Sequence, residues 1–259
     1  MSTVSPDSNE GNSYMRLVDQ TAGHSLVDPR NSTSNASNHW HATSSPTGDE
    51  IGCGSLNISM INTWAILRGF MRFDLSSLSG TITSAKFKFY NDTQNGLMND
   101  GDKFYLVGGT FGGSITVADY SNITNRPSSG TYAGTSVRTY TSAVEINISA
   151  GGAPQLFEVS LTSEAITDIN SAVGSGNFDV VMVSEEDYLS DFSGLLDNNI
   201  QIQGCDICGA DGYTSGEACY NKGPVLELST GYGNKVYNIS AISTINGISS
   251  GGISKVNEV

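Results

Sequence analysis

Four cysteines are the residues of this chain whose type and spacing most directly suggest chemistry: Cys53, Cys205, Cys208 and Cys219. Cys205-x-x-Cys208 is a zinc-site spacing, but a tetrahedral zinc ion needs four ligands and a second Cys-x-x-Cys is absent. We therefore expect disulfides, with at least one bridge among Cys205, Cys208 and Cys219, and with Cys53 as a fourth partner. Zinc held by these cysteines, or by some of them and a histidine, is the alternative.

Oxygen ligands gather in residues 91–102, where Asp92, Asn99, Asp100 and Asp102 alternate with glycine and other turn residues. Such hard oxygen atoms are the ligands that calcium prefers, although their spacing is not that of an EF-hand. Calcium is the one cofactor that the sequence suggests, and we expect none to be required. The competing interpretation is an ordinary turn on an acidic surface.

The triplet His39-Trp40-His41 is the candidate carbohydrate-binding site. It lies in the long polar stretch 19–48, and an exposed tryptophan is a flat apolar plate on which sugar rings stack. The alternative is structural, because Trp40 could simply pack this stretch against the rest of the domain.

No set of residues indicates an enzyme. The chain has only 3 histidines, no Ser-His-Asp arrangement stands out, and Gly-x-Ser-x-Gly is absent. Carboxylates are plentiful, but a glycosidase pair is defined by its separation in space, which the sequence does not give. We expect a non-enzymatic protein, with a polysaccharide-degrading enzyme as the weakest alternative.

Charge excludes several classes of partner. With 12 basic and 26 acidic side chains the formal net charge is −14, which disfavours nucleic acid and anionic membrane surfaces. No run approaches the ~20 apolar residues of a membrane span. The N-terminus lacks the basic start and apolar core of a signal peptide, so we expect another route of release, such as a virus particle freed by lysis.

The elements that must position these residues are strands. In residues 65–90, Lys86 and Lys88 alternate with Phe87 and Phe89, which is typical of a half-buried antiparallel strand. Residues 178–183 are apolar on both faces and predict a central strand. One short helix is expected after Thr162, with Gly174 as its stop. We expect one β sandwich in which Phe73, Leu75, Phe87, Phe89, Val181 and Val225 are buried.

The sequence of residues 65–90 resembles that of a known family. Arg-Phe-Asp-Leu-Ser-Ser-Leu (72–78), followed by Ile-Thr-Ser-Ala-Lys-Phe-Lys-Phe-Tyr (82–90), resembles the hallmark hairpin of DNRLRE-type jelly rolls. That family is similar to carbohydrate-binding modules of secreted bacterial and archaeal proteins. Residues 155–183, and then Ser-Gly-Glu (215–217) with Pro-Val-Leu-Glu-Leu (224–228), fit its later segments. The six-letter signature that names the family is absent. The resemblance implies an all-β antiparallel sandwich, or jelly roll, with one short helix.

Residues 232–259 differ from the rest of the chain. Ile-Ser-Thr-Ile-Asn-Gly-Ile (242–248) and Ile-Ser-Lys-Val-Asn-Glu-Val (253–259) repeat one pattern, and Asn246-Gly247 can form a tight turn. This repeated sequence resembles the tails of tailed-phage structural proteins. Such a segment cannot bury its apolar residues alone, so we expect it to join a neighbouring subunit. The assembly residues would be Ile242, Ile245, Ile248, Ile253, Val256 and Val259.

The chain therefore divides into a polar arm (1–12), a jelly-roll domain (13–231) and a C-terminal assembly tail (232–259). We expect a structural protein of a phage particle, such as a capsid decoration, head fibre or tail appendage. Its partners would be other virion subunits, further copies of itself and a host-surface glycan. A secreted, extracellular carbohydrate-binding module is the alternative.

Overall fold

A computed structural model gives the fold of most of the chain. The backbone is described for residues 1–5, 14–22, 30–31, 38–39, 50–58, 63–91, 101–146, 154–193, 201–208, 222–230, 244–245 and 248–249. None of the helices in these ranges has both the length and the apolar character that a membrane crossing requires.

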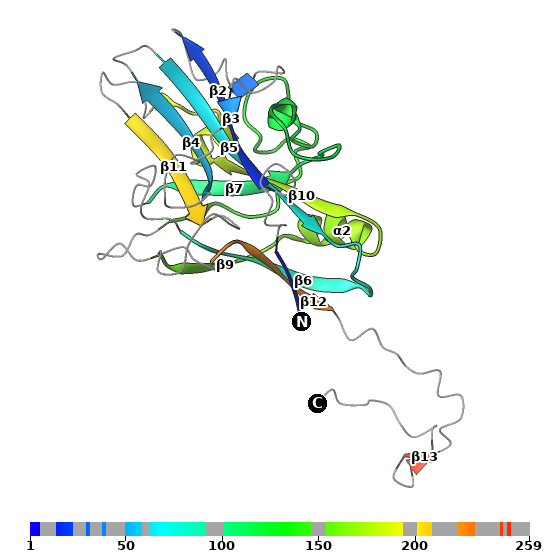
Figure 1. The fold of residues 1–259 in the computed structure, drawn as a ribbon. Helices are drawn as coiled ribbons and strands as arrows, with labels where there is room; N and C mark the ends of the chain where they lie inside the picture. The colour runs from blue at the N-terminus through cyan, green and yellow to red at the C-terminus, as the bar shows by residue number, and fades with distance from the viewer. Residues whose placement is uncertain are drawn as a thin grey trace.

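Two antiparallel sheets lie face to face, the smaller one below the larger one in Figure 1. The smaller sheet has the order β1 (Ser2–Val4), β12 (Val225–Thr230), β6 (Ile82–Tyr90) and β9 (Leu156–Ser160). The larger sheet follows the path β11 (Gln201–Cys208), β4 (Glu50–Ile58), β5 (Thr63–Asp74), β10 (Asn177–Ser184), β7 (Lys103–Gly108) and β8 (Val144–Glu145), with β2 (Tyr14–Ala22) on β5 and β3 (Asn38–His39) on β2. The expected all-β antiparallel sandwich is confirmed.

The core between the sheets is aromatic. Phe73, Phe87 and Phe89 are at most 1% exposed, and the rings of Phe73 and Phe87 meet edge to face at 6.4 Å across the two sheets. Leu75 is buried in the same cluster. The alternation in β6 therefore predicted correctly which side chains face the core.

A second core lies on the outer face of the larger sheet. β10 is buried on both faces, as expected of a central strand, and Val181 points into the second core rather than the one that contains Phe73. The expected burial of Val181 is confirmed, in this second core. The expected burial of Val225 was wrong, because Leu226 and Leu228 are the residues of β12 that face inward and Val225 is half-buried. A shift of one residue along a strand exchanges its two faces.

Residues 109–140, called the covering segment below, lie over this outer face. They are largely irregular, with one short 3-10 helix, η2 (Val117–Ser121), capped by Thr116. Residues 114–117 form no strand, and Thr116 instead caps this 3-10 helix. Tyr120 and Tyr132 bury their rings almost completely, so the segment is part of the second core.

One helix of two to three turns, α2 (Ser163–Ala172), lies beside β6 and β10 (Figure 1). The hydroxyl of Thr162 accepts the N–H of Ala165 at 3.3 Å, and Gly174 takes a φ of +75° just after the helix ends. Both signals are the ones expected from the sequence. Asn170 fixes the helix to β6, because its amide accepts from Ile82 N and donates to Ile82 O, each at 2.8 Å.

The larger sheet forks at Gly69. β5 pairs with β2 along residues 63–71, and its other edge pairs first with β4 (63–67) and then with β10 (69–74). A Cβ on Gly69 would lie 2.7 Å from Ile51 Cγ2 and 3.2 Å from Gly52 O. The missing side chain therefore allows the ends of β4 and β10 to meet on one edge of β5.

Two stretches of polar or glycine-containing sequence are partly strands. Residues 204–208 belong to β11, and the stretch 19–48 contains the end of β2 and all of β3. Pairing with β4 and β5 makes these segments strands, because their polar and glycine-rich composition gives little strand signal of its own.

Candidate functional site

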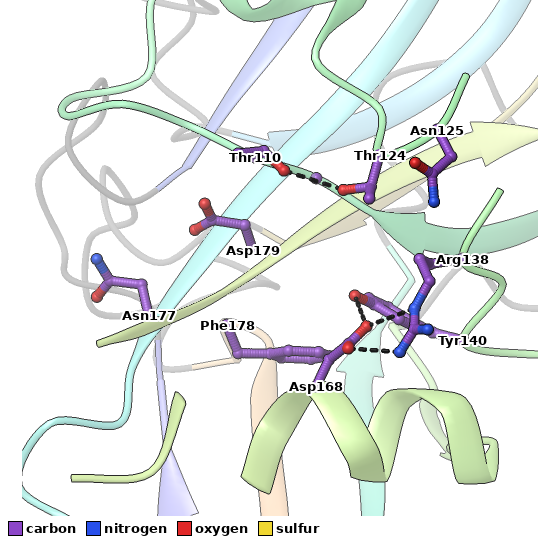
Figure 2. A pocket seen from close by; sticks show the side chains of 10 residues that line it. Thr110, Thr124, Asn125, Arg138, Tyr140, Asp168, Asn177, Phe178 and Asp179 are labelled. Carbon is purple, nitrogen blue, oxygen red and sulfur yellow. Dashed lines mark hydrogen bonds and ion pairs between the residues drawn. The ribbon is translucent and has the colours of Figure 1, made fainter. Parts of the chain in front are cut away.

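An open pocket of about 470 Å³ lies where β7 ends and β10 begins, between the covering segment and α2 (Figure 2). Its volume is within the usual range of small-molecule sites, about 300–1,000 Å³. The lining is mostly polar and consists of Gly109, Thr110, Thr124, Asn125, Arg138, Tyr140, Asp168, Asn177, Phe178 and Asp179.

One wall of the pocket is built on Asp168 of α2. The Arg138 guanidinium donates to both oxygens of this carboxylate, and the Tyr140 hydroxyl donates to Oδ2 at 2.8 Å (Figure 2). Burial, together with the Asp168 carboxylate, raises the pKa of Tyr140. Arg138 is also 3.3 Å from Glu164, one turn earlier in α2. The helix therefore holds Arg138 and Tyr140 in fixed positions on this wall.

The facing wall is built on Asp179 of β10. Arg72, its partner in the β5–β10 register, donates to both carboxylate oxygens, at 2.8 and 3.0 Å. The N–H of Phe111 adds a third bond at 2.9 Å, and Arg72 also donates to the carbonyls of Phe111 and Gly113. The hydrogen bonds of Asp179 raise the pKa of Arg72. The Arg72–Asp179 pair thus anchors the start of the covering segment to the sheet.

The rim supplies the groups that face solvent. Asn177 and Thr110 are exposed, and the hydroxyls of Thr110 and Thr124 are 3.0 Å apart. Asn125 has a φ of +59°, in the left-handed region, and its amide donates to Ser136 O at 3.1 Å. Asparagine tolerates this backbone better than most residues.

The rings in the pocket do not form a stacking plate. Tyr140 and Phe178 are 4% and 2% exposed and pack on each other with centroids 5.0 Å apart. A bound molecule would therefore meet hydrogen-bonding groups rather than a flat apolar face.

The pocket chemistry suits binding more than proton transfer. A general acid for glycoside hydrolysis must hold a proton, whereas Asp168 and Asp179 each accept two hydrogen bonds from a guanidinium. Both carboxylates therefore orient arginine and tyrosine donors. The remaining rim groups can exchange hydrogen bonds with a hydroxyl-rich molecule.

The carbohydrate-binding and calcium residues predicted from the sequence are only partly described. His39 of β3 pairs with Leu17 of β2, while Trp40, His41, Asp92, Asn99 and Asp100 lie outside the described residues. Asp102 is described, and its charge contributes, after burial, to the raised pKa of Glu186. Within the described ranges no group of three or more His, Cys, Asp or Glu residues is placed to hold a metal ion. Both sites stay predictions.

The cysteines are constrained by strand geometry. Cys53 and Cys208 are fully buried, and Cys205 of β11 lies opposite Cys53 of β4 in the register. Three residues of extended strand separate the Cα atoms of Cys205 and Cys208 by about 10 Å. This exceeds the ~7 Å limit for a disulfide, and it is too far for both thiolates to bind one zinc ion at about 2.3 Å. A Cys205–Cys208 bridge is excluded. Bridges to Cys219, which lies outside the described residues, stay predictions.

The sequence reasoning did not identify the pocket. A signal was available in the scarcity of basic residues, because a chain with 12 bases and 26 acids can pair nearly every arginine. Arg72 and Arg138 are indeed each paired with a carboxylate that lines the pocket. The partners lie 107 and 30 residues away, so spacing alone could not identify them.

Comparison with protein-family models and with curated proteins gives no match for this chain.

Proposed function

We propose that this chain is a non-enzymatic structural protein of a phage particle, with the sandwich facing outward and residues 232–259 joining it to other subunits. A capsid decoration, a head fibre and a tail appendage all fit this description. The observation that carries the proposal is a strand pair in the tail. β13 (Thr244–Ile245) and β14 (Ile248–Ser249) pair with each other and with no other described strand.

The register of this pair agrees with the pattern of the repeat. Ile245 lies opposite Ile248, which leaves Asn246 and Gly247 between the strands, as a two-residue hairpin requires. An isolated two-stranded hairpin is marginally stable in water and needs a further surface. A neighbouring subunit would supply such a surface.

The strand that precedes the tail, β12, has no free edge with which the tail could pair. β12 is bonded to β6 on one edge and to β1 on the other, so both of its edges are filled. The chain after Thr230 therefore cannot extend the small sheet at β12. The resemblance of the tail to tailed-phage proteins and the net charge of −14 are consistent with a soluble particle subunit.

Truncation after Tyr232 tests this proposal. β12 ends at Thr230, so the shortened protein should keep the thermal unfolding midpoint of the full chain. It should, however, fail to oligomerise or to join purified particles, as measured by light scattering and by mass spectrometry of the particles. Normal assembly of the truncated chain would show that the tail is not the attachment device.

A second function, carbohydrate binding as in a secreted module, is favoured by the polar pocket. We expect a glycan array to show binding that Asn177→Ala weakens roughly five- to tenfold, the effect of about one hydrogen bond. Trp40→Ala distinguishes the pocket from the site predicted around His39, Trp40 and His41. Thr83→Val, on the opposite sheet, is the matched control. An array without any binding would remove this second function and leave the first untouched.

A further inference from the structure

One edge of the smaller sheet is closed by a very short strand, β1. Within the described strands β1 pairs only with β12, and the chain begins beside β12 in Figure 1. Ser2 and Thr3 are exposed, and Val4 alone is partly buried against the core. A strand of three residues with a single core contact is weakly held. The edge of β12 beneath it is therefore a place where another extended segment could add to the sheet.

The C-terminal tail contains two near copies of the β1 sequence. Met-Ser-Thr-Val (1–4) matches Ile-Ser-Thr-Ile (242–245) and Ile-Ser-Lys-Val (253–256) position by position. Each copy is an apolar residue, a serine, a threonine or lysine, and a β-branched apolar residue. The end of the first copy forms β13, which is paired with β14. The second copy, which lies outside the described residues, is therefore the candidate to take the place of β1.

The charge of the second copy suits the position that Thr3 occupies. Thr3 lies directly opposite Glu227 in the β1–β12 register, and the match places Lys255 at this position. The Glu227 carboxylate is 14% exposed and is bound by Lys88 Nζ at 2.7 Å. Glu158 on the same face binds two lysines, at 2.9 and 3.0 Å, so a glutamate here can accept a second one. Opposite charges directly across an antiparallel pair stabilise it.

The apolar end of the second copy fits as well. The match places Val256 at the position of Val4, opposite the buried Leu226, so the core-facing residue type is unchanged. We propose that residues 253–256 of a second copy of this chain replace β1 on β12, so that each smaller sheet receives a strand from a neighbour. The proposal rests on attachment through the tail and names the surface that receives it. The edge is filled while β1 is bound, so β1 must leave before the neighbour's strand can pair.

Charge reversal provides the first test. Lys255→Glu and Glu227→Lys should each weaken self-association of the full chain, because like charges would then face each other across the new strand pair. An equimolar mixture of the two variants should recover association between unlike chains. Native mass spectrometry with one variant isotope-labelled would detect these mixed oligomers. Lys235→Glu makes the same charge change in the tail outside both copies and should associate like the unmodified chain.

Two outcomes of this test would overturn the proposal. One is a Lys255→Glu variant that associates as the unmodified chain does. The other is a mixture that stays monomeric, because a segment that pairs with β12 of its own chain gains nothing from a second variant.

Deletion of residues 1–5 provides the second test, which does not depend on the folding of Glu227→Lys. Removing β1 removes the competing occupant of the β12 edge, so self-association should shift to lower protein concentration. The same deletion combined with truncation after Gly252 should stay monomeric, which separates strand exchange from unspecific pairing of an exposed edge. Unchanged or weakened association after the deletion alone would contradict the exchange.

The proposal can fail while attachment through the tail holds. In that case truncation after Tyr232 would abolish assembly, whereas Lys255→Glu and the deletion of residues 1–5 would leave it unchanged. Such a result would place the attachment of the tail on another surface and overturn only the exchange at β12.

Discussion

Aspartate–arginine pairs set the chemistry of individual residues in this protein. Asp168 and Asp179 each bind one guanidinium, so the two pocket carboxylates act as fixed acceptors. Asp187 instead serves two buried arginines and is itself 0% exposed. The same pair of residue types therefore builds an open polar pocket in one place and a buried ion-pair cluster in another, and burial makes the difference.

Glu186 gives a pH-dependent prediction at the residue scale. Burial, with the nearby charges of Asp102 and Glu185, raises its pKa above the usual 4.5. A carboxyl group whose pKa is raised on folding holds its proton more tightly in the folded state. Its ionisation therefore costs stability as the pH rises from the usual value through the raised one. Glu186→Gln should raise the unfolding midpoint near neutral pH and change it little at about pH 4.

Glu158→Gln is the control of opposite sign. Hydrogen bonds from Lys88 and Lys86 lower the pKa of Glu158, so its charged form favours the folded state. This variant should not gain stability near neutral pH. A midpoint for Glu186→Gln at or below that of the unmodified chain would contradict the prediction.

The residues that could be predicted from sequence are those fixed by local pattern. Alternation of lysine and phenylalanine placed Phe87 and Phe89 in the core, because the side-chain period of a strand is two. Asp168 gave no comparable signal, because on the helix it is one of several half-exposed polar residues. Its role depends on Arg138 and Tyr140, which the fold brings to it.

Helices and strands show the same difference between features that a local sequence pattern predicts and features that depend on distant residues. The α2 cap and stop, and the central position of β10, were readable because they rest on nearby residues or on continuous apolar character. β12 was identified as a strand but with the wrong face inward at Val225, because its short apolar run does not fix the register. β11 contains Gly204 and two cysteines and carries little strand signal of its own, so its pairing with β4 could not be predicted from nearby residues.

Thr162 gives a prediction at the scale of the helix. Its hydroxyl caps α2 by accepting from Ala165 N and donates to Thr139 O at 2.9 Å. Thr162→Ala should lower the free energy of unfolding by ~0.5–2 kcal/mol and weaken any ligand of the pocket, because α2 carries Asp168. Urea titration and a binding assay would measure the two effects.

Thr167→Ala is the matched control for the helix. Thr167 is exposed and its hydroxyl bonds only to Ser163 O within the same helix, at 2.9 Å. Alanine favours a helix interior, so this variant should change the unfolding free energy very little. Equal losses in both variants would show that the cap is unimportant.

At the scale of the whole molecule, the two cores predict an uneven response to truncation of side chains. Phe87 is 1% exposed between the sheets, and Phe87→Ala should cost ~3–5 kcal/mol. Val225 is half-buried on the outer side of β12, and Val225→Ala should cost about 1 kcal/mol or less. Chemical denaturation of both variants checks this. Comparable losses would mean that β12 is placed in the wrong register.

The fork at Gly69 has a mechanical consequence. β4 and β10 are not bonded to each other, so within the described strands the backbone hydrogen bonds that connect the β4–β11 arm to the β10–β7 arm all pass through β5. A force applied to either arm would reach the other arm as shear along β5 alone. β2 is paired with β5 along most of the length of β5, and this continuous ladder of hydrogen bonds would resist sliding of β5. A force applied between these two arms would therefore be carried by β5.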